Sequence, residues 1–264
     1  MSPEGARPPL AASNARVKAA RKLARRAERA GQRLFLADGP RAVEGALSVE
    51  GCVVEVFATT DALEPYADLL AAAGGVTLVE ARAMDGLSDS VSPAGVVAVC
   101  RFLDVPLGSL AGPARLWAVC ADVRDPGNAG TVVRTADAAG ADAVVLAGTS
   151  VDPYNPKTVR ATVGSLFHLP VAVAPDPAAA VAAARSAGLT VLAADGAGEL
   201  DLFDADLSGP TAWLFGNEAH GLAPELADLA DHRVAIPIHG RAESLNLSTA
   251  AAVCLYASAR AHRP

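Results

Sequence analysis

The sequence predicts an α/β protein of two domains, the second of which is built on a parallel sheet. Its 264 residues exceed the roughly 100–200 residues that one hydrophobic core usually serves. Short, near-continuous apolar runs alternate with helix-like segments, as in a parallel sheet covered on both faces. Proline and glycine gather at residues 105–113, which indicates a linker. We therefore expect a first domain over 1–104, a linker over 105–113 and a second domain over 114–264.

The first domain is predicted to be a small α/β unit. Ser13 or Asn14 can cap a helix that runs to about residue 30, where Gly31 ends it. Gly39-Pro40 opens another helix, which runs to residue 47. Between and after these helices the pattern predicts strands at 34–37, 53–59, 76–80 and 96–100, and a further helix at 63–73.

The second domain continues the alternation over a longer stretch. Strands are expected at 116–121, 143–146, 169–173, 190–193, 212–215 and 234–236, and helices at 129–139, 177–186 and 245–260. A Rossmann-type nucleotide enzyme is the alternative for such a pattern. The chain has neither a G-x-G-x-x-G turn after the first of these strands nor a Walker Gly-Lys-Ser/Thr motif, so that alternative is disfavoured.

Cysteine use and hydropathy limit the class of protein. Four cysteines, Cys52, Cys100, Cys120 and Cys254, lie far apart in apolar segments without C-x-x-C spacing, so we expect small buried hydrophobes and no metal site. No apolar run is long enough to span a bilayer, and the start of the chain shows no pattern of a cleaved signal. The expectation is a cytoplasmic protein without a membrane partner.

Charge is distributed unevenly along the chain. The formal net charge is −7, yet the first 33 residues carry nine basic and two acidic side chains, a balance of +7 against −14 for the rest. A basic helix on an acidic body is expected where phosphate contacts are local. Charge alone also allows a solvated helix face that has no partner. The candidate phosphate contacts in this helix are Arg21, Lys22, Arg25 and Arg26.

Three glycine- and asparagine-bearing signatures follow strands of the second domain. The first is Asn128-Ala129-Gly130-Thr131-Val132-Val133-Arg134; the second is Leu214-Phe215-Gly216-Asn217-Glu218; the third is Ile236-Pro237 followed by Glu243-Ser244-Leu245-Asn246-Leu247. Each alone is a strand-to-helix turn. In this order they resemble the three motifs of the SpoU (TrmH-type) RNA ribose 2'-O-methyltransferases of the SPOUT superfamily.

The resemblance implies a fold, a cofactor and a partner. It implies a trefoil knot in the second domain, S-adenosylmethionine as cofactor, and a homodimer formed through that domain. The first domain resembles the substrate-binding domain that precedes the catalytic domain in many SpoU enzymes. That likeness rests on the basic first helix, on Asp38-Gly39-Pro40-Arg41, and on the turn Ser92-Pro93-Ala94-Gly95 before the last strand.

Similarity to the family also assigns the cofactor-binding positions. The backbone at Gly216, Ile236 and Leu245 is expected to hold S-adenosylmethionine, and Gly216 would allow close approach because it has no side chain. Leu214, Ala194 and Leu247 are secondary candidates. Packing at strand ends is the structural alternative for these apolar positions.

The catalytic candidates are polar residues of the three motifs. Arg134 is expected to position the RNA phosphate and the reacting ribose through its planar fork, and because a guanidinium stays protonated the proton acceptor is left open. Asn128 would hold that arginine or a substrate phosphate, and Glu218 would orient the arginine or the loop. Ser244 and Asn246 would contact substrate or the residues of the first motif. His220, beside Glu218, is interpreted as a loop residue.

The remaining RNA candidates and the target complete the prediction. Residues 152–160 resemble the family segment that precedes a Gly-Ser-Leu-Phe helix end, so Lys157 and Arg160 join Arg41 as expected phosphate contacts. The expected substrate is structured RNA, specifically 23S ribosomal RNA. Two alternatives stay open: a transfer-RNA 2'-O-methyltransferase, and a non-catalytic RNA-binding or assembly factor. Intact motif residues count against the last.

Overall fold

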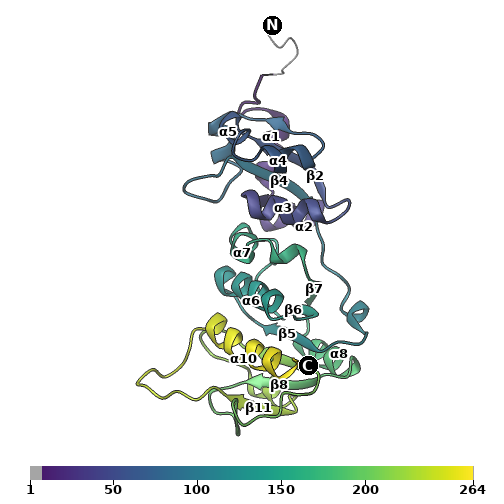
Figure 1. The fold of residues 1–264 in the computed structure, drawn as a ribbon, viewed down its shortest axis with the longest axis vertical. Helices are drawn as coiled ribbons and strands as arrows, with labels where there is room; N and C mark the ends of the chain where they lie inside the picture. Colours follow the sequence, from purple (N-terminus) through teal and green to yellow (C-terminus); the bar gives the residue numbers. More distant parts are fainter. Residues whose placement is uncertain (1–7, 264) are drawn as a thin grey trace. The chain divides into compact units, whose positions relative to one another are not determined.

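The structure is a computed structural model that describes residues 8–263, and its chain forms two compact units (Figure 1). The first unit comprises residues 8–102 together with Tyr154–Phe167, and the second comprises the remainder from Leu103 onward. Within the described chain, no helix is both long enough and apolar enough to cross a membrane. The segment Tyr154–Phe167 falls inside the span that the sequence assigns to the second domain, and the domain boundaries 1–104, 105–113 and 114–264 remain a prediction.

The first unit is a small sheet with helices packed on it. Its strand order is β1-β4-β2-β3, with β4 antiparallel to both β1 and β2, and β3 parallel to β2. The strand expected at 76–80 contains only two residues, and α5 was not predicted. The elements are β1 (Leu34–Asp38), α3 (Pro40–Ser48), β2 (Val53–Ala58), η1 (Thr60–Ala62), α4 (Ala67–Ala72), β3 (Thr77–Leu78), α5 (Ala81–Asp85) and β4 (Val96–Arg101).

The single basic helix expected from residue 13 or 14 to residue 30 is in fact two helices, α1 (Ala15–Lys22) and α2 (Arg26–Gln32). Asn14 caps the first, as predicted: its side chain accepts from the Arg16 N–H. The break lies where the buried Arg29 guanidinium donates to the carbonyls of Leu23 and Ala24, at 2.9 and 2.8 Å. These bonds satisfy carbonyls that the end of α1 leaves unpaired. Helix α2 ends at Gln32, not at Gly31.

Segment Tyr154–Phe167 belongs to the aromatic core of the first unit. The Tyr154 ring stacks on Phe102 with centroids 3.9 Å apart and lies 4.7 Å from Phe35. Phe167 also stacks on Phe35, with ring centroids 6.1 Å apart. Arg160 donates to the backbone carbonyl and the carboxylate of Asp89, at 2.8 and 3.0 Å. The segment contains α7 (Pro156–Thr162) and η3 (Ser165–Phe167).

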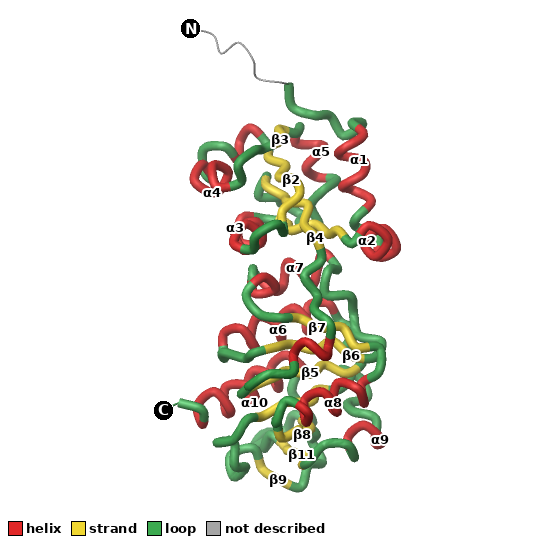
Figure 2. The backbone as a smooth tube through the Cα atoms, turned by 90° about the vertical axis from the view of Figure 1, so that its right-hand side faces the viewer, coloured by secondary structure: helices red, strands yellow, loops and turns green. Residues whose placement is uncertain are grey.

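The second unit is a seven-stranded sheet in the order β7-β6-β5-β10-β8-β11-β9, with every pair parallel. Helices cover both faces (Figure 2): α8 packs on the face that carries Trp117 and Leu214, while Trp213 on the opposite face donates to Ser258 of α10 at 2.9 Å. The strands are β5 (Leu116–Ala121), β6 (Ala143–Ala147), β7 (Val171–Ala174), β8 (Thr190–Ala194), β9 (Leu200–Asp201), β10 (Thr211–Phe215) and β11 (His232–Ala235). The remaining elements are η2 (Leu107–Leu110), α6 (Pro126–Ala138), α8 (Pro177–Ser186), α9 (Pro224–Ala227) and α10 (Leu247–Ala261).

This topology brings the sequence signatures to one edge of the sheet. Strands β5, β10, β8 and β11 occupy four successive positions in the sheet and run in the same direction. The loops that follow their carboxyl ends therefore emerge together, where parallel α/β sheets hold their ligands. The first signature follows β5, the second follows β10, and the third follows β11.

Candidate active site

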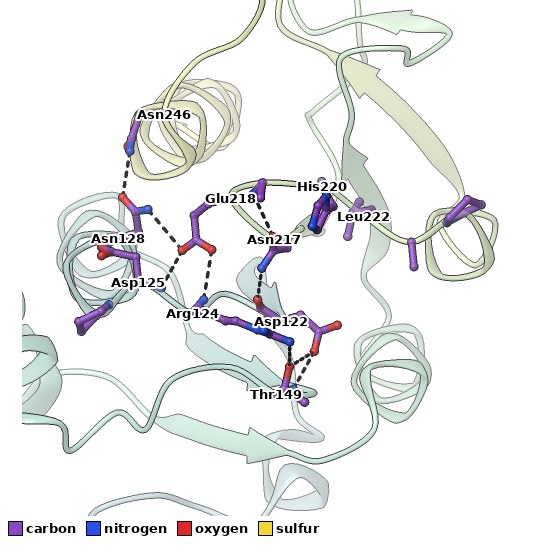
Figure 3. Close-up of a pocket in the computed structure, with 15 residues that line it drawn as sticks. Asp122, Arg124, Asp125, Asn128, Thr149, Asn217, Glu218, His220, Leu222 and Asn246 are labelled. Carbon is purple, nitrogen blue, oxygen red and sulfur yellow. Dashed lines mark hydrogen bonds between the residues drawn. The ribbon is translucent and has the colours of Figure 1, made fainter.

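The first signature opens helix α6, and its cap leaves Asn128 free for other contacts. Asp125 is the N-cap, and its carboxylate accepts from the Asn128 N–H at 2.7 Å. Pro126 occupies the first turn, where a missing N–H has no consequence. The helix therefore begins three residues before the predicted start at 129. The Asn128 side chain, which could have served as the cap, points instead toward Glu218 and Asn246 (Figure 3).

Glu218 joins the first and second signatures. Its carboxylate accepts from the backbone N–H groups of Arg124 and Asp125, at 3.2 and 3.0 Å, and from the Asn128 amide at 3.3 Å. Burial alone would raise the pKa of Glu218, but these hydrogen bonds lower it below its ordinary value. Glu218 was predicted to orient either Arg134 or a loop, and in the structure its hydrogen bonds go to loop backbone. The ionised carboxylate therefore fixes the turn before α6.

Asn246 attaches the third signature to the same cluster. As the N-cap of α10, it accepts through Oδ1 from the N–H groups of Ser248 and Thr249, at 2.9 and 3.3 Å. Its Nδ2 is left to donate to Asn128 Oδ1 at 3.0 Å. The predicted contact of Asn246 with the first motif is thus confirmed, and α10 begins at Leu247, two residues after the predicted start. Glu218, Asn128 and Asn246 form one chain of hydrogen bonds across three loops.

The loop after β10 folds back on itself at Gly216. A Cβ atom at Gly216 would lie 2.2 Å from the Gly221 carbonyl carbon and 2.4 Å from the Leu222 nitrogen. The backbones of Asn217 and Gly221 exchange two hydrogen bonds of 2.8 Å, and the Asn217 amide donates to the Asp122 carbonyl at 2.8 Å. Glycine is therefore required at 216 by the chain's own backbone, independently of any cofactor.

A cavity of about 570 Å³ lies between this loop and the ends of β8 and β11. Its size falls within the roughly 300–1,000 Å³ of small-molecule and cofactor sites. Five of the six predicted cofactor positions line it: Ala194, Gly216, Ile236, Leu245 and Leu247. The walls also include Phe215, Pro237 and Glu243, which are members of the signatures, and Asp195 and Ile238, which adjoin a strand end or a signature; none of the five was predicted to bind the cofactor.

Leu214, the sixth predicted cofactor position, is not in the cavity. It is fully buried and belongs to the core cluster between the sheet and α8. Successive side chains of a strand point to opposite faces, and one residue further along β10 Phe215 reaches the cavity wall. The Leu214 side chain therefore lies away from the cavity, and its role at the cofactor stays a prediction.

A second cavity, of about 1280 Å³, lies on the other side of Glu218. It shares Asn217, Glu218, Ala219 and Gly221 with the first cavity. Its other walls come from the start of α6 and the turn before it, the loop after β6, the loop before α9 and the start of α10: Asp122, Arg124, Asp125, Pro126, Asn128, Thr149, His220, Leu222, Ala223, Pro224 and Asn246. His220 is an exposed member of the loop and has no hydrogen bond among the described residues.

Two predicted catalytic residues stand apart from the hydrogen-bonded cluster. Arg134 is exposed on α6 and lines neither cavity; within residues 8–263 it forms no hydrogen bond or ion pair. The expectation that Asn128 holds Arg134 is therefore not met within one chain, because Asn128 bonds Glu218 and Asn246. Ser244 lines the smaller cavity.

The predicted RNA contacts all lie at the surface, but they differ in what they bond. Arg21, Lys22, Arg25, Arg26 and Lys157 are exposed. Arg41 is paired with Glu44 at 2.9 Å, and Arg160 with Asp89. Arg29, counted among the basic residues of the first helix, is buried and structural, and Arg7 lies outside the described residues.

The cysteines are buried free thiols, as predicted. Burial raises the pKa of Cys120 and of Cys254 to about 12, so neither is a nucleophile at neutral pH. In the described part of the chain no group of three or more His, Cys, Asp or Glu side chains could hold a metal ion.

The fold and the cavities are those of an α/β protein whose candidate site lies at the carboxyl edge of a parallel sheet. Residues 115–256 match the SpoU rRNA Methylase family, and residues 14–98 match the MRM3-like substrate binding domain. The chain belongs to the SpoU rRNA methylase family. It is an S-adenosylmethionine-dependent ribosomal-RNA ribose 2'-O-methyltransferase with an N-terminal substrate-binding domain, which removes the alternative of a non-catalytic factor.

Individual relatives cover the chain to different extents. The 23S rRNA (guanosine(2553)-2'-O)-methyltransferase RlmP of Bacillus subtilis is 35% identical over 93% of this chain and 96% of its own length. The 23S rRNA (uridine(2479)-2'-O)-methyltransferase of Streptomyces viridochromogenes is 43% identical over 51% of this chain and 49% of its own length. Among solved structures, the AdoMet-bound rRNA methyltransferase from Sinorhizobium meliloti superposes with a TM-score of 0.84 and 35% identity, covering 96% of this chain and 97% of that one.

Proposed function

We propose that this enzyme methylates the 2'-hydroxyl of one nucleotide in 23S ribosomal RNA, in the cytoplasm. The similarity to RlmP over nearly the whole of both chains supports this target. The hydrogen-bonded cluster of Glu218, Asn128 and Asn246 carries the assignment within this chain, because it joins all three motifs at the edge between two cavities. The two named relatives modify different nucleotides, a guanosine and a uridine, and so leave the base open.

The smaller cavity is the proposed site of S-adenosylmethionine. Its volume suits the cofactor, its walls at Ile236, Leu245 and Leu247 are apolar, and Gly216 and Gly196 expose backbone to it. Asp195 and Glu243 add carboxylates that can accept from the cofactor's hydroxyl or ammonium groups. The bound cofactor supplies an electrophilic methyl group on a sulfonium. The protein's task is to bind both partners in line, which lowers the entropic part of the barrier.

The chain's own residues then act on geometry and charge. Glu218 fixes the turn before α6, and Asn128 and Asn246 fix that turn against the start of α10. Arg134, exposed and without a partner among the described residues, is available for the RNA phosphate next to the reacting ribose. It lines neither cavity of its own chain. We therefore propose that Arg134 serves the site of a second copy in a homodimer formed through the C-terminal unit.

The first unit is the proposed RNA-binding module. Helices α1 and α2 present Arg21, Lys22, Arg25 and Arg26 at the surface. Cations that neutralise phosphates give affinity that falls steeply with salt. Lys157 adds a further exposed cation in the same unit.

The function is tested by mapping ribose methylation across the ribosomal RNA of cells with and without the gene. We expect one 2'-O-methyl group in 23S RNA to disappear on deletion and to return with the parent gene. The Glu218→Ala gene should restore it poorly. An unchanged 23S map, with a methyl group lost from transfer RNA, would overturn the proposed target.

A further inference from the structure

Asp122, which no motif includes, is built into the wall of the larger cavity. It follows β5 and adopts a left-handed backbone conformation with φ 57°, which aspartate and asparagine tolerate better than other non-glycine residues. Its carboxylate Oδ1 accepts from both the N–H and the hydroxyl of Thr149, each at 2.7 Å. A Cβ at Gly148 would lie 2.5 Å from that oxygen, so the surroundings are fitted to this side chain.

The second oxygen of Asp122 is the one available to a ligand. Oδ2 accepts no hydrogen bond from any described residue, and Figure 3 draws dashed lines to only one oxygen of this carboxylate. The hydrogen bonds from Thr149 lower the pKa of Asp122, so the free oxygen is an ionised acceptor at neutral pH. Asp122 lines the cavity beside the proposed active centre.

Arg124 places donors next to this acceptor. One terminal nitrogen, Nη2, donates to the Thr149 hydroxyl at 3.4 Å (Figure 3), and among the described residues the guanidinium has no other hydrogen bond and no ion pair within 4 Å. A guanidinium carries five N–H donors. Through its hydrogen bonds to both side chains, Thr149 places the unbonded Oδ2 of Asp122 and the remaining N–H donors of Arg124 on one wall of the cavity.

The position of this wall fits the base of the reacting nucleotide. The same cavity contains Glu218, Asn128 and Asn246, which we place at the reacting ribose. Single nucleotides are read by hydrogen bonds to the Watson–Crick edge of an unstacked base. Every base presents both donors and acceptors on that edge, but in an order that differs from base to base.

We propose that Asp122 and Arg124 read the base of the methylated nucleotide, with Asp122 Oδ2 accepting from a base N–H and Arg124 donating to a neighbouring ring nitrogen or carbonyl oxygen. This inference rests on the proposed function, since it takes the ribose to lie at the Glu218 cluster. It assigns a substrate-selecting role to two residues outside the three motifs.

The Asp122→Asn variant tests the assignment because its orientation is fixed. The Thr149 N–H requires an acceptor, so the amide oxygen must take the place of Oδ1. The NH₂ group then replaces Oδ2 and presents donors where the parent presents an acceptor. Asparagine also tolerates the left-handed backbone. The variant should fold and should favour a base with an acceptor at that position.

The measurement is kcat/KM for transfer of a tritiated methyl group to four RNA fragments that span the mapped site and differ only in the target base. The fragments are taken from whichever RNA the mapping identifies, so a target outside 23S RNA overturns the proposed function while this inference is still tested. The parent should prefer its natural base, and Asp122→Asn should reduce that preference about 10-fold or more, as expected for one lost base-edge pairing. Arg124→Gln should also reduce it, without reversing the order.

Asp142→Asn is the matched control. The Asp142 carboxylate accepts from the N–H groups of Arg115 and Leu116, at 2.6 and 2.9 Å, and lines neither cavity. It should leave the base preference unchanged. A parent enzyme without base preference would overturn the inference. So would an Asp122→Asn enzyme that loses rate by the same factor on all four fragments, which would show a purely structural role.

Discussion

At the scale of single residues, the site depends on side chains that hold backbone rather than substrate. Glu218 accepts from two N–H groups of the turn before α6, and Asn246 uses one amide for both a helix cap and a link to Asn128. These bonds set the positions of three loops before any ligand arrives. Preorganised polar groups of this kind need not rearrange during the reaction.

Gly216→Ala should abolish cofactor binding through a clash within the protein. The new Cβ would lie 2.2 Å from Gly221 backbone, and backbone cannot move aside without opening the loop. We expect no detectable binding of S-adenosylhomocysteine in calorimetry, under conditions in which the parent is saturated. Gly209→Ala is the control: Gly209 also lies in the second unit, has nothing within 4 Å of its Cβ position and lines neither cavity. Equal affinities for both variants would contradict this account.

Glu218 should make the folded protein less stable as the pH falls into the acid range. Its pKa is lowered in the folded protein, so its contribution is present above the unfolded-state value of about 4.3 and is lost as the pH falls through the lower folded value. Glu218→Gln removes that contribution and sets an NH₂ group against a backbone N–H. The difference in Tm between parent and variant should be largest near pH 6–7 and should shrink below about pH 4. A difference that is constant from pH 3 to pH 7 would count against the hydrogen-bonded carboxylate.

At the scale of secondary-structure elements, one buried side chain holds the break between α1 and α2. Arg29 is buried and donates to the carbonyls of Leu23 and Ala24. The neighbouring cations Arg25 and Arg26 stay at the surface. The buried and the exposed arginines therefore have opposite roles.

Arg29→Met should destabilise the first unit by about 2 kcal/mol, because the buried carbonyl of Leu23 and the part-buried carbonyl of Ala24 lose their donor. Arg26→Met, at an exposed position of the same helix, should change the free energy of unfolding by less than about 0.5 kcal/mol. Urea denaturation of both variants measures the difference. Equal stabilities would mean that Arg29 is not structural.

Charge reversal on α1 and α2 should separate RNA binding from chemistry. Changing Arg21, Lys22, Arg25 and Arg26 to Glu should weaken RNA binding and flatten its salt dependence, while cofactor affinity stays unchanged. Arg134→Ala should do the converse, abolishing methyl transfer with little loss of RNA affinity. Filter-binding titrations at several salt concentrations, run beside a methyl-transfer assay, compare the two. If RNA affinity is unchanged after charge reversal, these four residues form only a solvated surface and do not bind RNA.

Pattern and propensity predicted elements well where local signals agree with burial. Strand Leu116–Ala121 and helix Pro177–Ser186 match their expected bounds, since one is a continuous apolar run and the other starts at Asp176-Pro177. The break at Leu23 was missed because its cause is a bond from Arg29. Two-residue strands such as β9 carry no period to detect.

The sequence indicated which residues line the cavities better than it indicated the contacts between them. Five of six cofactor positions line the smaller cavity, but the alternation of β10 turns Leu214 away. The separation of Arg134 from Glu218 could not be seen in spacing, because it depends on how α6 packs. Asp122 gave no signal at all, since a left-handed backbone at an aspartate leaves no mark in composition.

At the scale of the whole molecule, the exposed Arg134 predicts that activity requires two chains. A homodimer through the C-terminal unit would pair equal surfaces. Sedimentation velocity should give a dimer at micromolar concentration, and mixing inactive Arg134→Ala with inactive Gly216→Ala chains should restore part of the activity, because one of the two sites in a mixed dimer is intact. A fully active monomer, or no restoration by mixing, would contradict this arrangement.

The first unit includes the segment Tyr154–Phe167, which is synthesised after much of the second unit. Phe35 and Phe102 are covered by Tyr154 and Phe167, which follow β5 and β6 of the second unit along the chain. During synthesis the amino-terminal unit therefore cannot close its aromatic core when residue 102 emerges, although domains usually fold in order of emergence. It must wait, partly open, until residue 167 has left the exit tunnel. In this chain, therefore, the unit that is synthesised first cannot finish folding first.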